Sequence, residues 1–272
     1  MKIFDFNIHL PSIIDRDVNV TINQDLKLSP KELIAGIFER HKEIIGKVDG
    51  INVLLFNPNA HLEDISEFKV VSEKLFPKIS YTSLVNFRCN NLDDYMHKLV
   101  ASGSKAIIFN SYLQTISEED FFSILQVCKI AEKNDLIICV DGSFGTSKMF
   151  EYDNLKLACF IADHIIKTPI IIVHSGGKRI LEAMLLALSN SNVWLDTSFS
   201  LPFYIGSSVE LDFAFAYKKI GCDRIIFGSD SPYCVFDDVV KMHFDFFEKH
   251  KFSTNQIENI MYKNSISLFD LE

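Results

Sequence analysis

Eight short apolar segments recur along the chain, and most of them end at polar or glycine residues. The segments lack the alternation of a half-exposed strand, so they predict strands that are buried on both faces, as in a parallel sheet. The predicted strands cover residues 3–8, 51–56, 79–85, 105–109, 136–140, 170–173, 193–195 and 224–227.

Helical patterns lie between the predicted strands. One begins at Ser29, a capping residue that is followed by Pro30 at the first helical position and by Glu32 three residues after the cap. Eight strands that alternate with helices predict an α/β fold, a (β/α)8 TIM barrel, with a single domain over residues 1–272. An open doubly wound sheet is the alternative, but its G-x-G-x-x-G first turn is missing. Further helices are predicted at residues 92–102, 117–134, 178–189, 209–220 and 254–269.

The composition narrows the class of protein. Lys plus Arg number 27 against 36 for Asp plus Glu, and this net charge of −9 argues against a nucleic-acid partner, which needs clustered cations. No apolar run approaches membrane-spanning length and no signal peptide is visible, so no membrane partner is expected. The six cysteines form no C-x-x-C pair, so they are expected to be reduced thiols of a cytoplasmic protein.

Three predicted strands carry His9, His174 or Asp230 at their C-terminal ends. In a parallel barrel these ends meet at one face, where catalytic and ligand-binding side chains collect. Asp230 would be costly to bury unless it is paired, although it also suits the N-terminus of the next helix. His174 precedes Ser-Gly-Gly and suits metal binding, proton transfer or anion binding, or the role of a hydrogen-bonded core histidine.

Four motifs carry a resemblance to a known family. They are HSGG at residues 174–177, NVWLDTS at 192–198, FGSDSP at 227–232 and NSISLF at 264–269. In this order and spacing they resemble the amidohydrolase-related family of metal-dependent hydrolases and decarboxylases. The resemblance implies a TIM barrel that acts on small cyclic esters, amides or carboxylated compounds.

Members of that family usually begin with D-x-H-x-H on the first strand and add a histidine at the end of the fifth. Here Asn7 replaces the first histidine of the motif, and Asp141 stands near the position of the strand-five histidine. The resemblance implies metal ligands at His9, Asp141, His174 and Asp230. Such an oxygen-rich set favours manganese or magnesium over tightly held zinc, and a metal-free site is left open.

Four further residues are candidates for substrate binding. Asn7 would hydrogen-bond a substrate or a water, or act only as a spacer inside the barrel. Arg88 follows the third strand and suits a substrate carboxylate, because its guanidinium group matches a carboxylate in two contacts. Phe144 and Tyr204 fall on predicted loops and would line the pocket.

The leading hypothesis is a hydrolase that acts on a small cyclic ester, amide or carboxylate. Asp230 would activate a water as general base, His174 would assist the developing oxyanion or leaving group, and any metal would be weakly held. A barrel that has lost catalysis and binds a small ligand or a partner is the first alternative, because Asn7 and Asp141 depart from the family pattern. A nonoxidative decarboxylase is the second. The expected partner is a small-molecule substrate, and a homodimer is left open.

Overall fold

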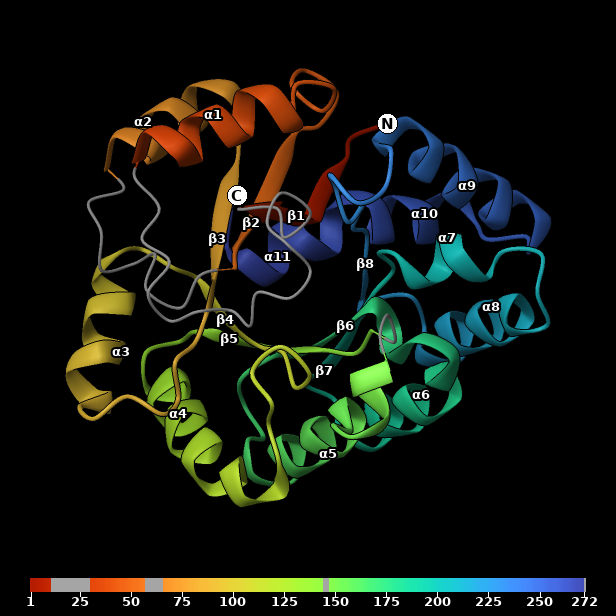
Figure 1. Ribbon diagram of the computed structural model, residues 1–272. Helices are drawn as coiled ribbons and strands as arrows, with labels where there is room; N and C mark the ends of the chain where they lie inside the picture. Colours follow the sequence, from red (N-terminus) through yellow and green to blue (C-terminus); the bar gives the residue numbers. More distant parts are fainter. Residues whose placement is uncertain (11–29, 57–65, 144–146, 272) are drawn as a thin grey trace.

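Eight parallel strands pair in chain order to form the sheet of the computed structural model (Figure 1). The structure describes residues 1–10, 30–56, 66–143 and 147–271. This arrangement confirms the predicted barrel, and every predicted strand is present within two residues at each end. The strands are β1 Phe4–Leu10, β2 Gly50–Leu55, β3 Ile79–Leu84, β4 Ala106–Phe109, β5 Ile137–Asp141, β6 Ile170–Val173, β7 Val193–Asp196 and β8 Ile225–Ile226.

The seam between β8 and β1 closes the barrel through a few backbone contacts, because β8 has only two residues. The Phe6 N–H donates to the Phe227 carbonyl at 2.9 Å, and the His9 N–H donates to the Ser231 carbonyl at 2.9 Å. An isolated parallel bridge joins Ile8 to Ser231. The segment that follows β8 therefore runs beside β1 as far as the C-terminal face.

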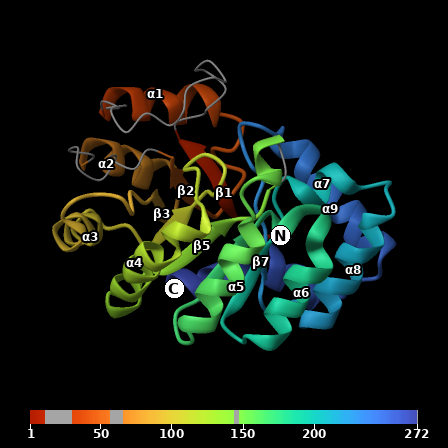
Figure 2. The same ribbon diagram turned by 60° about the horizontal axis from the view of Figure 1, so that its bottom comes forward.

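Helices surround the barrel, and Figure 2 shows several of them from below. The predicted helices at residues 92–102, 117–134, 178–189 and 209–220 are present, although the first residues of two of these ranges are 3-10 turns. The predicted helix at residues 254–269 is divided by a π-turn over Asn259–Lys263. The helices are α1 Pro30–Arg40, α2 Ser66–Leu75, α3 Leu92–Ala101, α4 Phe121–Lys133, α5 Asn154–His164, α6 Ile180–Ser189, α7 Ser200–Tyr204, α8 Val209–Ile220, α9 Phe236–Lys249, α10 Thr254–Glu258 and α11 Asn264–Phe269.

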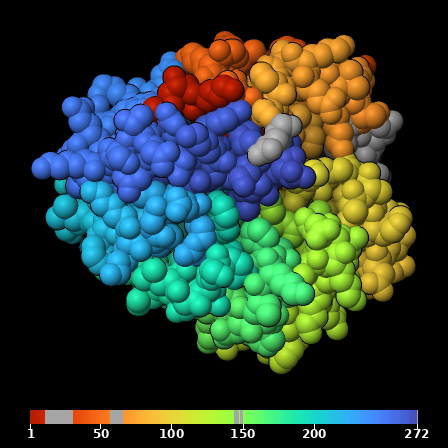
Figure 3. Space-filling model, turned by 180° about the vertical axis from the view of Figure 1, so that it is seen from behind, coloured from red at the N-terminus to blue at the C-terminus, as the bar shows by residue number. Residues whose placement is uncertain are grey.

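The two faces of each strand pack into different apolar clusters. One cluster lies between the strands and the outer helices, and the other gathers the alternate strand residues with residues of α11. Phe4 and Phe6 each lie 6.0 Å from Phe269, measured between ring centroids. Figure 3 shows the C-terminal helices beside the N-terminal segment on the back of the molecule. Apolar side chains thus fill one end of the barrel, and polar side chains occupy the other.

Two further properties concern the whole described chain. No helix in the described ranges is both long and apolar enough to cross a membrane. All six cysteines are free thiols, and five of them are at least partly buried in the apolar clusters of the barrel. Free thiols agree with the prediction that these cysteines do not form a disulfide framework.

Candidate functional site

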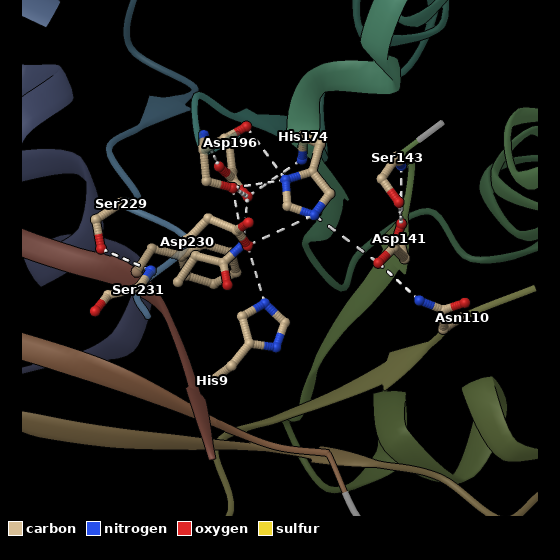
Figure 4. Close-up of polar contacts among 12 residues, drawn as sticks. His9, Asn110, Asp141, Ser143, His174, Asp196, Ser229, Asp230 and Ser231 are labelled. Atoms are coloured by element: carbon tan, nitrogen blue, oxygen red, sulfur yellow. Dashed lines mark hydrogen bonds and ion pairs between the residues drawn. The ribbon is translucent and has the colours of Figure 1, made fainter. Parts of the chain in front are cut away.

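Four side chains from distant parts of the sequence meet at the C-terminal ends of β1, β5, β6 and β8 (Figure 4). His9 Nε2 lies 3.0 Å from Asp230 Oδ1. His174 Nε2 lies 4.0 Å from the same oxygen and 3.9 Å from Asp141 Oδ2. All four residues are at most 5 % exposed. The structure therefore brings together the four residues that the strand-end pattern and the family resemblance pointed to.

Unusual backbone conformations place three of the residues at this site. His174, Ser175 and Asp230 have φ values of 60°, 53° and 62°, in the left-handed region that non-glycine residues seldom adopt. Such conformations cost about 1–3 kcal/mol each and are concentrated at functional sites, where the surrounding structure enforces them. At Gly142 an added Cβ would lie 2.6 Å from the Val173 carbonyl oxygen, so only glycine lets β5 approach β6 this closely.

His174 lies between two carboxylates on one side of its ring and Ser198 on the other. Nδ1 is 3.2 Å from the Ser198 carbonyl oxygen, which can only accept, so Nδ1 carries a proton. Burial alone would lower the pKa of His174, but the charges of Asp230, Asp141 and Asp196 outweigh it and raise the pKa. The ring is therefore biased toward the imidazolium form, and its Nε2–H faces Asp141 and Asp230.

Hydrogen bonds hold the two outer carboxylates in place. Asp141 Oδ1 accepts from the Ser143 N–H at 2.8 Å and from the Ser143 hydroxyl at 2.6 Å, and Oδ2 accepts from Asn110 Nδ2 at 2.8 Å. His9 Nε2 donates to Asp230, since a carboxylate oxygen can only accept. His9 Nδ1 has no partner within the described ranges. Phe56 and Tyr233 pack edge-on against the His9 ring.

A second layer of polar groups lies beneath His174. Asn7 Nδ2 donates to Ser198 Oγ at 2.7 Å, and the Ser198 hydroxyl lies 2.8 Å from Asp196 Oδ2 and 2.9 Å from His174 Nδ1. The His174 N–H donates to the same Asp196 oxygen at 3.2 Å. The Asn7 amide thus supports β7 and His174, and it is fully buried. The structure gives Asn7 a positioning contact with these groups.

The polar side chains of the site are hydrogen-bonded to one another and to their neighbours in this arrangement. Among the described residues no group of three or more His, Cys, Asp or Glu side chains has a geometry that could hold a metal ion. The candidate donor atoms take part in hydrogen bonds: His9 Nε2 is directed to Asp230, both oxygens of Asp141 accept from neutral groups, and the Asn7 amide is directed to Ser198. The metal-ligand roles of His9, Asp141, His174 and Asp230 stay predictions.

The other substrate-binding candidates lie apart from this cluster or beyond what is described. Both ends of the Arg88 fork contact Asp120, at 3.1 and 2.6 Å, and its nitrogens also donate to two loop carbonyls. The guanidinium is therefore occupied on the surface and does not reach the four-residue cluster. Tyr204 packs between Phe203 and Phe213, on the α7–α8 side. Phe144 lies outside the described residues.

Four residues around the site were not selected from the sequence: Asn110, Tyr112, Ser143 and Ser198. Asn110 directly follows the strand at residues 106–109, so the strand-end criterion that selected His174 applies to it equally. Tyr112 is partly buried, and burial together with the charges of Asp141 and Asp230 raises the pKa of its hydroxyl. Its phenol therefore stays protonated near the two carboxylates.

The C-terminal part of the chain matches the family model described as amidohydrolase, over residues 116–271. This chain belongs to the amidohydrolase family. The match includes Asp141, His174 and Asp230, and it confirms the family that the sequence motifs indicated. No curated protein matches the chain.

Solved structures with the same barrel come from several bacteria. A probable 2-pyrone-4,6-dicarboxylic acid hydrolase from Acinetobacter baumannii, with citric acid bound, is 12% identical over 99% of this chain and 100% of that one, with a TM-score of 0.64. An amidohydrolase from Burkholderia multivorans with bound zinc is 12% identical over 100% of both chains, with a TM-score of 0.68. A 2,6-dihydroxybenzoate decarboxylase from Rhizobium is 13% identical over 100% of this chain and 99% of that one, with a TM-score of 0.64. At such identities the similarity shows the shared fold.

Proposed function

We propose that this member of the amidohydrolase family is a hydrolase of a small cyclic ester or amide. The observation that carries the proposal is the placement of His174 Nε2–H 4.0 Å from Asp230 Oδ1. A group biased toward the protonated form thus stands beside a buried carboxylate, so the site presents a proton donor and a proton acceptor side by side. The pyrone hydrolase with the same fold makes a cyclic ester a reasonable substrate class.

The residues support a simple course of reaction. Asp230 accepts a proton from a water molecule while the water oxygen bonds to the carbonyl carbon of the ring. The electron pair of the C=O bond moves to the carbonyl oxygen, which accepts a hydrogen bond from His174 Nε2. The ring C–O or C–N bond then breaks, and the proton held by Asp230 passes to the leaving atom. His9 keeps Asp230 oriented through its 3.0 Å contact.

The acid–base step is tested with Asp230→Asn, because the amide keeps the shape of the side chain but cannot accept a proton. Purified protein is screened against lactones and cyclic amides, and Asp230→Asn is expected to lower kcat by about 100-fold or more, with a smaller effect on KM. Asp237→Asn is the matched control, since Asp237 is exposed on α9 and pairs with Lys47. Turnover by Asp230→Asn at the wild-type rate would show that Asp230 is not the general base.

The same assays are run after dialysis against a chelator, with and without added zinc or manganese. Turnover that persists without metal is expected, because the donor atoms are held by hydrogen bonds. Turnover that depends on added metal would instead assign Asp230 and His174 to metal binding.

A non-catalytic barrel is the second candidate. The observation in its favour is that Asn7 and Asp141 stand where the family usually has histidines. Both residues are hydrogen-bonded to neighbouring side chains. A ligand that binds wild type and Asp230→Asn equally, with no turnover by either, would favour this function over hydrolysis.

A further inference from the structure

His41 is a buried histidine that no part of the proposed reaction uses. It follows α1 directly and is 1% exposed. Nε2 lies 3.1 Å from the His9 carbonyl oxygen, and Nδ1 lies 3.1 Å from Ser231 Oγ. The two ring nitrogens of His41 therefore contact the backbone of His9 and the side chain of Ser231, the residue after Asp230.

The directions of both hydrogen bonds follow from the chemistry of the partners. The His9 carbonyl can only accept, so His41 Nε2 carries the proton and donates. Burial lowers the pKa of His41 to about 4, so the ring is neutral at physiological pH and Nδ1 has a lone pair. The Ser231 hydroxyl must then donate to Nδ1. Each nitrogen has one satisfied bond, and the ring cannot turn over without losing both.

The contacts of His41 lie on both sides of the seam that closes the barrel. The His9 N–H donates to the Ser231 carbonyl, and the Asp230 N–H donates to the Asn7 carbonyl at 3.0 Å. With only two residues in β8, these bonds and the bridge from Ile8 help to align the two segments, together with the Ser229 N–H, which donates to Asp5 Oδ1 at 2.8 Å. The side chains of His9 and Asp230 meet at the same place. A ring that binds both segments thus limits how far they can slide or separate.

We propose that His41 is a positioning residue that holds His9 and Asp230 in register across the seam between β1 and β8. The effect on turnover rests on the hydrolase function proposed above, whereas the effect on the His9–Asp230 contact does not. The inference concerns geometry, so it is tested by a signal from His9 as well as by rate.

Three variants separate the two contacts. His41→Leu removes both, while His41→Gln places an amide N–H near the position of Nε2 and keeps a donor for the His9 carbonyl. Ser231→Ala leaves His41 in place and removes only the hydroxyl donor. The matched control is His243→Gln, because His243 is also fully buried, with Nε2 2.8 Å from Thr197 Oγ1 and Nδ1 2.8 Å from the Val239 carbonyl oxygen.

The readout is the nuclear magnetic resonance signal of the His9 Nε2 proton that Asp230 binds. His41→Leu is expected to abolish this signal or move it upfield, His41→Gln to retain it in part, and His243→Gln to leave it unchanged. If a substrate is found, kcat should fall about tenfold in His41→Leu with less change in KM, since about 1.4 kcal/mol of lost positioning is a factor of ten.

The outcomes distinguish this inference from the proposed function. A folded His41→Leu protein with an unchanged His9 signal would overturn the positioning role, even if hydrolysis is confirmed. A lost signal with no hydrolysis of any tested ring would support the positioning role and count against the hydrolase. If His41→Leu does not fold, His41→Gln and Ser231→Ala decide, and an unchanged signal in both would refute the proposal.

Discussion

Acid should destabilise this barrel through buried neutral histidines, and His243 on α9 gives the clearest case. Its Nδ1 donates to the Val239 carbonyl oxygen, and its Nε2 therefore accepts from the Thr197 hydroxyl, both at 2.8 Å. Protonating Nε2 would set a second N–H against a hydroxyl donor and bury a charge that no carboxylate among the described residues offsets. Burial accordingly lowers the pKa of His243 to about 4.

The size of the effect follows from the difference in pKa between the two states. The unfolded chain takes up this proton near the ordinary pKa of 6.5, and the folded protein only near 4. The unfolded state therefore binds more protons between these values, so the free energy of unfolding falls as the pH drops from 6.5 to 4. The difference corresponds to about 3 kcal/mol at about 1.4 kcal/mol per pKa unit. Below pH 4 this residue contributes no further loss.

The assay is urea unfolding at several pH values between 7.5 and 4, followed by circular dichroism. His243→Gln keeps polar groups on the side chain but cannot titrate. The variant is expected to be less stable than wild type at pH 7.5, and the gap should narrow by about 3 kcal/mol by pH 4. His97→Gln, on the exposed face of α3, is the matched control. A gap for His243→Gln that stays constant over this range would refute the reasoning.

Two other substitutions test the packing and charge beneath the site. Asp5 is fully buried, and burial raises its pKa to about 7, so wild type loses stability as the pH rises from 3.8 to 7. In the same urea assay, the free energy of unfolding of Asp5→Asn should therefore rise by about 4 kcal/mol relative to that of wild type over this pH range. A difference between the two proteins that does not change with pH would contradict this prediction. At Gly228 an added Cβ would lie 2.8 Å from Asn7 Cβ and 3.0 Å from Ser198 Cβ. Gly228→Ala should lower the free energy of unfolding by about 1–3 kcal/mol. An unchanged Tm would show that Asn7 and Ser198 can move away from the added methyl group without a loss of stability.

The strands were the most predictable part of the fold, because a strand buried on both faces leaves a continuous apolar run in the sequence. The run at residues 170–173 coincides with β6, and the run at 79–85 exceeds β3 by one residue. Four helices, α2, α5, α7 and α9, have no predicted residue range, and α7 lies where the sequence predicts the loop that carries Tyr204. In α9 the buried residues Phe236, Val239, His243 and Phe246 recur at helical spacing, so the pattern was present in the sequence.

The π-turn that separates α10 from α11 could not be predicted, since no proline or glycine interrupts residues 254–269. The π-turn contains a contact with the barrel, because the Phe227 N–H donates to the Ile260 carbonyl inside this segment. A contact between residues 33 positions apart is set by the assembled barrel and leaves no local signal.

The site was also predictable only in part. The residues at the strand ends could be found from the sequence, whereas the partners that the fold gives them could not. A charged or polar residue after an apolar run pointed to His9, His174 and Asp230, and the family resemblance added Asp141. The structure brings the four together. The guanidinium group of Arg88 suits a substrate carboxylate, so the sequence makes Arg88 a candidate for substrate binding. The sequence could not show that Asp120, a residue 32 positions later, binds the same guanidinium group.

The substitutions at the family's usual ligand positions come with partners that suit the new residues. Asp141 is a carboxylate in place of an imidazole, and Asn110 and Ser143 supply three donors to it. Asn7 is an amide in place of an imidazole, and Ser198 accepts from its Nδ2, whereas its Oδ1 is buried with no hydrogen-bond partner among the described residues. A residue that had merely drifted after loss of function would leave buried groups without bonds, at about 1–3 kcal/mol each. By this measure the three donors around Asp141 favour a site maintained for chemistry of its own, with His174 and Asp230 kept at its centre, and Asn7 does not add to the argument.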